Sequence, residues 1–246
     1  MGTKDWAGEL IEWADNNNIA QAVFDNAGEC VNGFPRDKQI LPRLTTLYII
    51  NGKITELPES IGALVNLQRL IVSANLTKLP ESIGNLSKLT YMSVSHNRLT
   101  ELPQSMSKLT SLTDLDLFSN RIVEFPESIG VLTNLINLDL GANALTELPE
   151  SIGSLTKLNN LGLHFNHLTK LSESIGALAN LWSLDLCANE LTKLPDLIAN
   201  MSELRWIKLG GNNLTEVNLS PLLLEIIKSG RLKISFDQPS RLSYMW

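Results

Sequence analysis

The chain has 246 residues, which is long enough to bury a hydrophobic core without disulfides or bound metals. Its 20 Lys and Arg residues against 26 Asp and Glu residues give a net charge of −6, so it has no general affinity for nucleic acid or anionic membranes. Two cysteines, Cys30 and Cys187, are too few for a disulfide-framed module or a cysteine-rich zinc site.

The start of the chain carries no recognisable targeting signal. Residues 1–6 lack the apolar region of a signal peptide, and Trp6 stands where a myristoylation signal needs Ser or Thr. No stretch approaches the roughly 18 uninterrupted apolar residues of a membrane span, so no membrane insertion is expected. We therefore expect a cytoplasmic protein, with secretion by a signal-independent route as the alternative.

Residues 5–15 predict an amphipathic helix that caps one end of the fold. The helix places Trp6, Leu10, Trp13 and Ala14 on one face, and three asparagines end it. Residues 31–43 then read as the back half of a degenerate repeat, because they have the leucine spacing of the units that follow. We expect residues 1–43 to form an N-terminal cap with a degenerate half repeat.

From Leu44 onward the chain repeats itself at intervals of 22 or 23 residues. The eight copies begin at Leu44, Leu67, Leu89, Leu112, Leu135, Leu158, Leu181 and Leu204. Their general form is L-x-x-L-x-L-x-x-N-x-L-x-x-L-P-x-x-I-G-x-L-x-x. The alternation in L-x-L predicts a short strand, and L-P-x-x-I-G-x-L predicts an irregular or short helical return segment. Since no copy can bury its own apolar edge, the copies must stack into a solenoid.

The asparagine at the ninth position of each copy lies where the chain leaves the strand. Its carboxamide can bond backbone groups that the turn leaves unpaired. Stacking predicts one structural ladder of these residues: Asn75, Asn97, Asn120, Asn143, Asn166, Asn189 and Asn212. The second copy is one residue short at positions 73–76, which predicts a distorted turn beside Asn75.

These motifs resemble leucine-rich repeats of the 23-residue L-P-x-x-I-G-x-L subtype, which occurs in plant intracellular Ras-group proteins, Ras-pathway scaffold proteins and many bacterial proteins. The resemblance covers residues 44–226. It implies an α/β repeat fold: a curved solenoid with a parallel β-sheet on its concave face, irregular or short helical convex arcs, and helical caps at both ends. It also implies protein binding as the usual activity.

The far end predicts a second cap. Residues 221–227 form a helix that begins at Pro221, Gly230 breaks it, and Leu232, Ile234 and Phe236 alternate as an edge strand. We divide the chain into the cap of residues 1–43, eight repeats over 44–226, and a C-terminal cap and tail over 227–246, all within one structural domain.

Side chains between the buried leucines of each strand face outward and form columns, because neighbouring strands lie about 4.8 Å apart. Exposed aromatic side chains and an acidic cluster gather there, which favours a protein partner, with a basic surface as one form of it. The candidate partner-binding residues are Tyr48, Ile71, Tyr91, Asp114, Asp116, Phe118, Asp139, His164, Phe165, Asp185 and Trp206. The L-D-L pattern is common in this kind of repeat, so some of these aspartates have an ordinary structural role as the alternative.

A second acidic band follows the Leu-Pro step, and we interpret it as a solvated edge. Its members are Glu59, Glu81, Glu127, Glu150, Glu173 and Asp196, supplemented by Glu56, Glu101, Glu124 and Glu147.

No enzymatic activity is expected, and no catalytic residue, cofactor or metal ligand is assigned. His164 approaches the outward-facing Cys187 of the next strand, but the sequence offers no oxyanion-binding group to make them a catalytic pair. Asp116 and Asp139 alone on an open sheet make a weak metal site.

We expect a protein–protein interaction module or scaffold, with a bacterial effector or a regulator of a signalling protein as particular forms. The alternatives are a carbohydrate or small polar ligand module and a regulatory subunit of an enzyme. A monomer is favoured.

Overall fold

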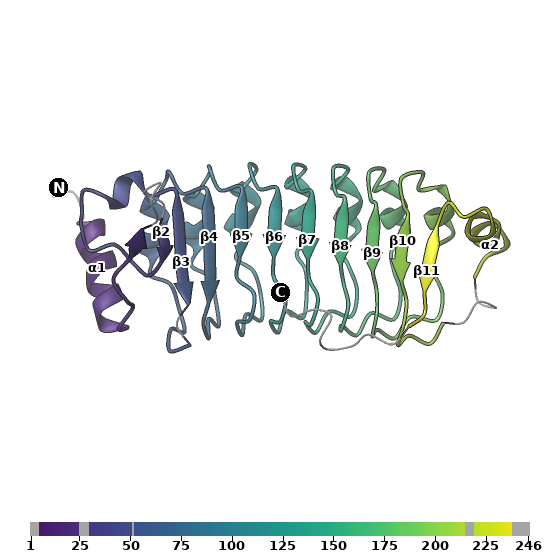
Figure 1. Ribbon diagram of the computed structural model, residues 1–246, viewed down its shortest axis with the longest axis horizontal. Coiled ribbons are helices and arrows are strands. Elements are labelled where there is room, and N and C mark those ends of the chain that lie inside the picture. The colour runs from purple at the N-terminus through teal and green to yellow at the C-terminus, as the bar shows by residue number, and fades with distance from the viewer. Residues whose placement is uncertain (1–4, 25–29, 51, 215–218, 238–246) are drawn as a thin grey trace.

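The computed structural model describes residues 5–24, 30–50, 52–214 and 219–237. The strands lie side by side along the long axis of an elongated solenoid, with helix α1 (Trp6–Asn16) at one end and helix α2 (Pro221–Lys228) at the other (Figure 1). Each repeat therefore contacts mainly the repeats before and after it, as expected for a solenoid.

Within the described residues, one open, curved, parallel sheet of nine strands runs in chain order from β3 to β11. The strands are β3 (Thr46–Ile50), β4 (Arg69–Ser73), β5 (Tyr91–Ser93), β6 (Asp114–Asp116), β7 (Asn137–Asp139), β8 (Asn160–Gly162), β9 (Ser183–Asp185), β10 (Trp206–Lys208) and β11 (Lys233–Ser235). Equal repeat positions pair in register, as Leu115 does with Leu138. The predicted curved solenoid is confirmed.

The return segments of the first seven repeats each contain a 3₁₀ helix, which begins just after the Leu-Pro step or, in the sixth repeat, after Ser172. These helices are η2 (Glu59–Ala63), η3 (Glu81–Asn85), η4 (Gln104–Lys108), η5 (Glu127–Val131), η6 (Glu150–Ser154), η7 (Glu173–Ala177) and η8 (Asp196–Asn200), and a shorter one, η1 (Leu41–Arg43), precedes the sheet. Proline precedes all but two of them, and Ser172 takes its place before η7 and bonds the backbone N–H of Ser174. The inward-facing leucines and isoleucines of strands and arcs are buried in a single hydrophobic cluster, whereas Ile50 on β3 and Leu197 in η8 are exposed.

The repeat asparagines lie along the turns after the strands. In Asn143, Oδ1 accepts from the backbone N–H of Ile122 at 3.0 Å, and Nδ2 donates to the carbonyls of Leu117 and Leu140, both at 3.0 Å. Five other repeat asparagines bond the preceding repeat in the same way: the side-chain oxygen accepts a backbone N–H, and the side-chain NH2 donates to a backbone carbonyl. They are Asn97, Asn120, Asn166, Asn189 and Asn212. Buried turn amides and carbonyls are thereby satisfied.

Asn75 is placed differently from the others, because its repeat is one residue short. In the longer repeats the residue before the asparagine adopts a left-handed conformation, with φ of 55° at His96 and 52° at Ala142. Ala74 has no such conformation. Asn75 instead donates to the carbonyl of Gly52, and Asn97 bonds the backbone N–H groups of both Ala74 and Leu76.

The N-terminal cap closes the hydrophobic core. Asp5 accepts from the backbone N–H of Gly8 at 3.0 Å and starts α1, whose Leu10 and Ala14 are fully buried. Trp13 packs edge-on against the buried Phe34, with ring centroids 6.1 Å apart. An antiparallel hairpin of β1 (Val23–Phe24) and β2 (Cys30–Asn32) lies within this cap, and the sequence analysis did not anticipate it.

The C-terminal cap contains the predicted helix and strand. Ser220 accepts from the backbone N–H of Leu223 and starts α2, while β11 pairs in parallel with β10 at the edge of the sheet. The backbone carbonyl of Asp237 lies so close to Gly210 that a side chain at position 210 would collide with it. The predicted tail over 238–246 lies outside the described residues.

Candidate functional site

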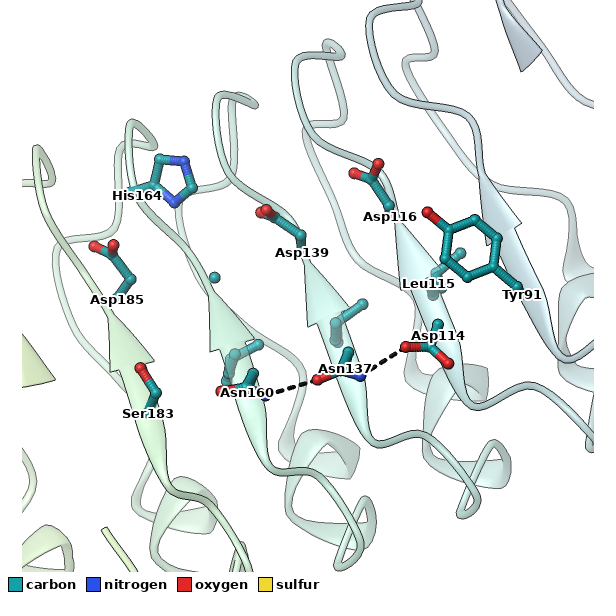
Figure 2. A pocket seen from close by; sticks show the side chains of 13 residues that line it. Tyr91, Asp114, Leu115, Asp116, Asn137, Asp139, Asn160, His164, Ser183 and Asp185 are labelled. Carbon is teal, nitrogen blue, oxygen red and sulfur yellow. Dashed lines mark hydrogen bonds between the residues drawn. The ribbon is translucent and has the colours of Figure 1, made fainter. Parts of the chain in front are cut away.

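The concave face of the sheet carries a shallow pocket of about 490 Å³ that extends from β5 to β9 (Figure 2). The polar side chains lining this concave pocket are Tyr91, Asp114, Asp116, Asn137, Asp139, Asn160, His164, Ser183 and Asp185. Their placement follows from the in-register strands, which put the third and fifth positions of successive repeats side by side.

Three aspartates of the pocket hold the ends of their own strands. One carboxylate oxygen of each accepts the backbone N–H two residues later: Phe118 for Asp116 at 3.0 Å, Gly141 for Asp139 at 2.8 Å, and Cys187 for Asp185 at 3.1 Å. This bond explains in physical terms why aspartate suits the L-D-L position, since the amide lies just beyond the strand.

The three aspartates differ in the partner of their second carboxylate oxygen. Asp116 accepts from the Ser93 hydroxyl at 2.7 Å, and Asp185 accepts from the Lys208 ammonium at 3.0 Å. For Asp139, no hydrogen bond to a second donor is found within the described part of the chain. Burial raises the pKa of the Asp139 carboxyl, and the negative charges of Asp116 and Asp185 add to this increase.

A row of polar side chains crosses the lower part of the pocket (Figure 2). Asn137 donates to Asp114 at 2.6 Å, and Asn160 donates to the side-chain oxygen Oδ1 of Asn137 at 2.7 Å. Thr113 donates its hydroxyl to the other oxygen of Asp114 at 2.7 Å. These bonds fix the side chains in one arrangement before any ligand arrives.

The expectation that His164 is exposed on this face is wrong, because its side chain is only 3% exposed. Gly141 of the preceding repeat leaves space that the imidazole ring fills, and the ring stacks on Phe118 with centroids 5.4 Å apart. Burial lowers the pKa of His164, and the charge of Asp139 partly opposes this decrease.

Asp185 and Cys187 are also more buried than the repeat frame predicts. Asp185 is 8% exposed because the Cys187 amide and the Lys208 ammonium cover its carboxylate. Cys187 is 3% exposed, so the expectation of an outward-facing thiol is wrong. Cys187 stands at the seventh position of its repeat, and the residues at this position in three other repeats, Gly141, His164 and Gly210, are buried as well.

The aromatic candidates do not all join the concave pocket. Tyr91 lines it, with the Arg69 guanidinium 4.1 Å from the ring centroid, and burial raises the pKa of its hydroxyl. Phe118 and Phe165 are half-buried around His164, whereas Trp206 lies toward the C-terminal edge with the Lys233 ammonium 4.7 Å from its centroid.

The remaining two candidates, Tyr48 and Ile71, are half-buried on β3 and β4 and do not line the pocket. Trp182 was missed: it is 45% exposed at the second repeat position, directly before β9. An apolar residue at a position that is otherwise mostly polar was the signal that could have identified it.

In the described part of the chain, no group of three or more His, Cys, Asp or Glu side chains is arranged to hold a metal ion. Within the same residues, no helix has the length and apolar character needed to cross a membrane.

A parallel solenoid with an asparagine row and an open concave face defines a repeat protein of the leucine-rich class. Comparison with protein families agrees: residues 36–122 match the model of a leucine-rich repeat region, and residues 156–214 match a second leucine-rich repeat model. The chain belongs to the leucine-rich repeat proteins, which serve in general as protein-interaction modules rather than enzymes. No curated protein sequence matches it significantly.

Solved structures show the same architecture. A leucine-rich repeat protein of Leptospira interrogans is 26% identical, with a TM-score of 0.62, over 88% of this chain and 60% of that one. The plant peptide hormone receptor RGFR1 in complex with RGF2 is 30% identical, with a TM-score of 0.60, over 70% of this chain and 28% of the receptor. Internalin C2 of Listeria monocytogenes shares the fold at 22% identity and a TM-score of 0.65, over 94% of this chain and 93% of its own.

Proposed function

We propose that the chain binds an extended segment of a protein partner across the concave pocket, and that lysine or arginine side chains of this segment meet its carboxylates. One observation carries the proposal: four aspartates line the pocket, and Lys208 neutralises only Asp185. Among the described residues, no lysine or arginine lies within ion-pair distance of Asp114, Asp116 or Asp139. Such a surface favours a cationic partner.

The rigidity of the pocket supports binding without a large ordering cost. Asn137 and Asn160 are held in place by the polar row, and Asp116 is held by Ser93 and a backbone amide. A preorganised surface loses little side-chain entropy when a partner arrives. The similarity to a receptor for a peptide hormone supports a peptide segment as the occupant.

The same binding role suits a scaffold in the cytoplasm or an effector that a bacterium delivers to a host signalling protein. The likeness to the Leptospira protein supports the bacterial setting. In both settings the chain contributes a surface and no chemistry, and a monomer suffices to present it.

Affinity capture with a charge-neutralised variant tests the proposal. The variant carries Asp114→Asn, Asp116→Asn and Asp139→Asn, because asparagine removes the charge and keeps one accepting oxygen, while its NH2 can donate to the Ser93 or Thr113 hydroxyl in place of the second oxygen. We expect it to retain the wild-type circular dichroism spectrum and to lose a specifically captured protein by at least about tenfold. The matched control carries Glu56→Gln, Glu173→Gln and Glu190→Gln, three exposed carboxylates outside the concave pocket.

A photo-crosslinking residue at Asn160, which lies in the pocket, should mark the same captured protein, whereas one at Thr169 on the outer edge should not. Equal capture by both variants would contradict the proposal. Binding that resists salt and is competed by free sugar would favour the carbohydrate alternative. Co-purification of an enzyme whose activity changes would indicate a regulatory subunit.

A further inference from the structure

A second hollow lies on the return segments of the third, fourth and fifth repeats, away from the strands. It has a volume of about 710 Å³ and is lined by residues 101–104, 123–127 and 146–149 together with Glu81. We call it the edge groove. Among the described residues, none of those that line it belongs to a strand or to the lining of the concave pocket, so the two hollows are separate.

The edge groove exposes apolar surface at one repeat. Val123 is 51% exposed and lines the groove. The other seven repeats have threonine at the equivalent position of the sequence: Thr55, Thr77, Thr100, Thr146, Thr169, Thr192 and Thr215. Val123 is linked to the preceding repeat by its backbone N–H, which donates to the Thr100 carbonyl at 3.4 Å. Since this hydrogen bond does not involve the side chain, the fold does not require an apolar residue there. An exposed valine beside Pro103 and Pro126 provides apolar contact area for a partner.

Glutamates rim this apolar surface, and none of the lysines, arginines and histidines that the structure describes lines the groove. Glu81 and Glu127 have a structural role that the sequence analysis missed, because each accepts a backbone N–H of the next repeat: that of Ser105 at 3.1 Å and that of Ser151 at 3.0 Å. Glu101 and Glu124 differ. Both are exposed, and no ion pair or hydrogen bond to them is found within the described residues.

Glu101 and Glu124 occupy the same repeat position as two other glutamates, and on both sides of the groove those glutamates are paired with lysines. Glu56 faces Lys78 at 3.3 Å, and Glu147 faces Lys170 at 3.5 Å. Glu101 and Glu124 stand between these pairs in neighbouring repeats, about 5 Å apart along the solenoid axis. Like charges at this spacing repel each other, and a cation from another molecule relieves the repulsion.

We propose that the edge groove docks an extended, basic segment of a protein partner. One apolar side chain of this segment covers Val123, and lysine or arginine side chains on either side of it reach Glu101 and Glu124. Alternate residues of an extended chain point to the same side, so each cation lies about 7 Å along the backbone from the apolar residue, a distance that a long lysine or arginine side chain spans to reach a glutamate beside Val123. The segment therefore has the pattern cation-x-apolar-x-cation, and it binds independently of the concave pocket.

Fluorescence anisotropy with the full chain tests this proposal. The probe is a fluorescein-labelled peptide with the sequence Arg-Ser-Leu-Ser-Arg, compared with one that has serine for leucine and one that has glutamate for both arginines. We expect saturable binding of the first peptide, at least threefold weaker binding of the serine peptide, and no binding of the glutamate peptide.

Two substitutions copy residues that this chain already uses at the same repeat positions. Glu124→Lys should weaken the dissociation constant of the first peptide at least about tenfold, and Val123→Thr about threefold. Both side chains are exposed, so the thermal transition should stay near that of the wild type. The matched control is Glu173→Lys, an exposed glutamate outside the groove.

Asp139→Asn in the concave pocket should leave binding of this peptide unchanged, which separates this inference from the proposed function. Equal affinity of wild type and Glu124→Lys would overturn the proposal. So would equal affinity for the leucine and serine peptides, or the absence of saturable binding up to about 1 mM, the weak limit of specific recognition.

Discussion

The imidazole ring of His164 lies so close to Gly141 that a Cβ built on the glycine would be 2.4 Å from His164 Cε1. The ring also stacks on Phe118, which restricts its movement away from residue 141. Gly141→Ala should therefore overpack the concave face and lower the free energy of unfolding by about 2 kcal/mol. Urea unfolding followed by circular dichroism measures this loss.

The matched control is Gly52→Ala, because a Cβ there meets only the Asn75 side chain at an ordinary 3.7 Å. We expect this control to change stability by less than about 0.5 kcal/mol. Adding His164→Ala to Gly141→Ala should recover part of the loss, since the collision disappears. Strictly additive losses in the double variant would show that the contact with His164 is not the cause.

Asn143 should be far more important for stability than Asn75. Its side chain bonds the backbone amide of Ile122 and the carbonyls of Leu117 and Leu140, all buried. Asn143→Ala leaves these groups unpaired and should cost about 3 kcal/mol, whereas Asn75→Ala should cost less than about 1 kcal/mol. Parallel urea titrations compare the two, and equal losses would contradict the distinction.

The repeat fold could be predicted from the sequence because the period specifies both strand and return segment many times over. Leu138 and Leu140 alternate in β7, and Pro149 marks the start of η6, so local pattern and global stacking agree. The hairpin of β1 and β2 was not predicted because residues 20–34 share no such period.

The direction of a side chain was easier to predict than its exposure. The frame places His164 correctly on the concave side, but its burial depends on the absence of a side chain at Gly141, one repeat earlier. Likewise, Glu81 and Glu127 read as solvated charges, although each also accepts a backbone N–H of its neighbouring repeat. A repeat pattern that treats each position separately cannot predict contacts between residues of neighbouring repeats.

Asp139 should make stability depend on pH in an unusual direction. Its folded pKa is raised above the unfolded value of 3.8, first by burial and then by Asp116 and Asp185, so the folded state binds this proton more tightly. The stabilising contribution is present below the unfolded pKa and is lost as pH rises through the folded pKa.

Asp139→Asn retains an oxygen to accept from the Gly141 amide and removes this loss. We expect the variant and the wild type to be similarly stable near pH 3, and the variant to become more stable by about 1 kcal/mol near pH 7. Urea midpoints across this range measure the difference. His164 titrates close by, so the same series should be repeated with His164→Phe to isolate the carboxyl. A difference that does not change with pH would refute this assignment.

Ala142 adopts a left-handed conformation with φ of 52°, where an L-residue with a Cβ is strained by about 1 kcal/mol or more. Its backbone N–H bonds the His164 carbonyl at 2.7 Å, which holds it in this conformation. Glycine removes the strain but loses more chain entropy on folding, so Ala142→Gly should raise the free energy of unfolding by about 0.5 kcal/mol. Ala144→Gly, two residues later and outside the left-handed region, should lower it by about the same amount. Opposite signs in urea unfolding therefore identify strain at Ala142, whereas destabilisation by both substitutions would show that the turn holds the alanine without cost.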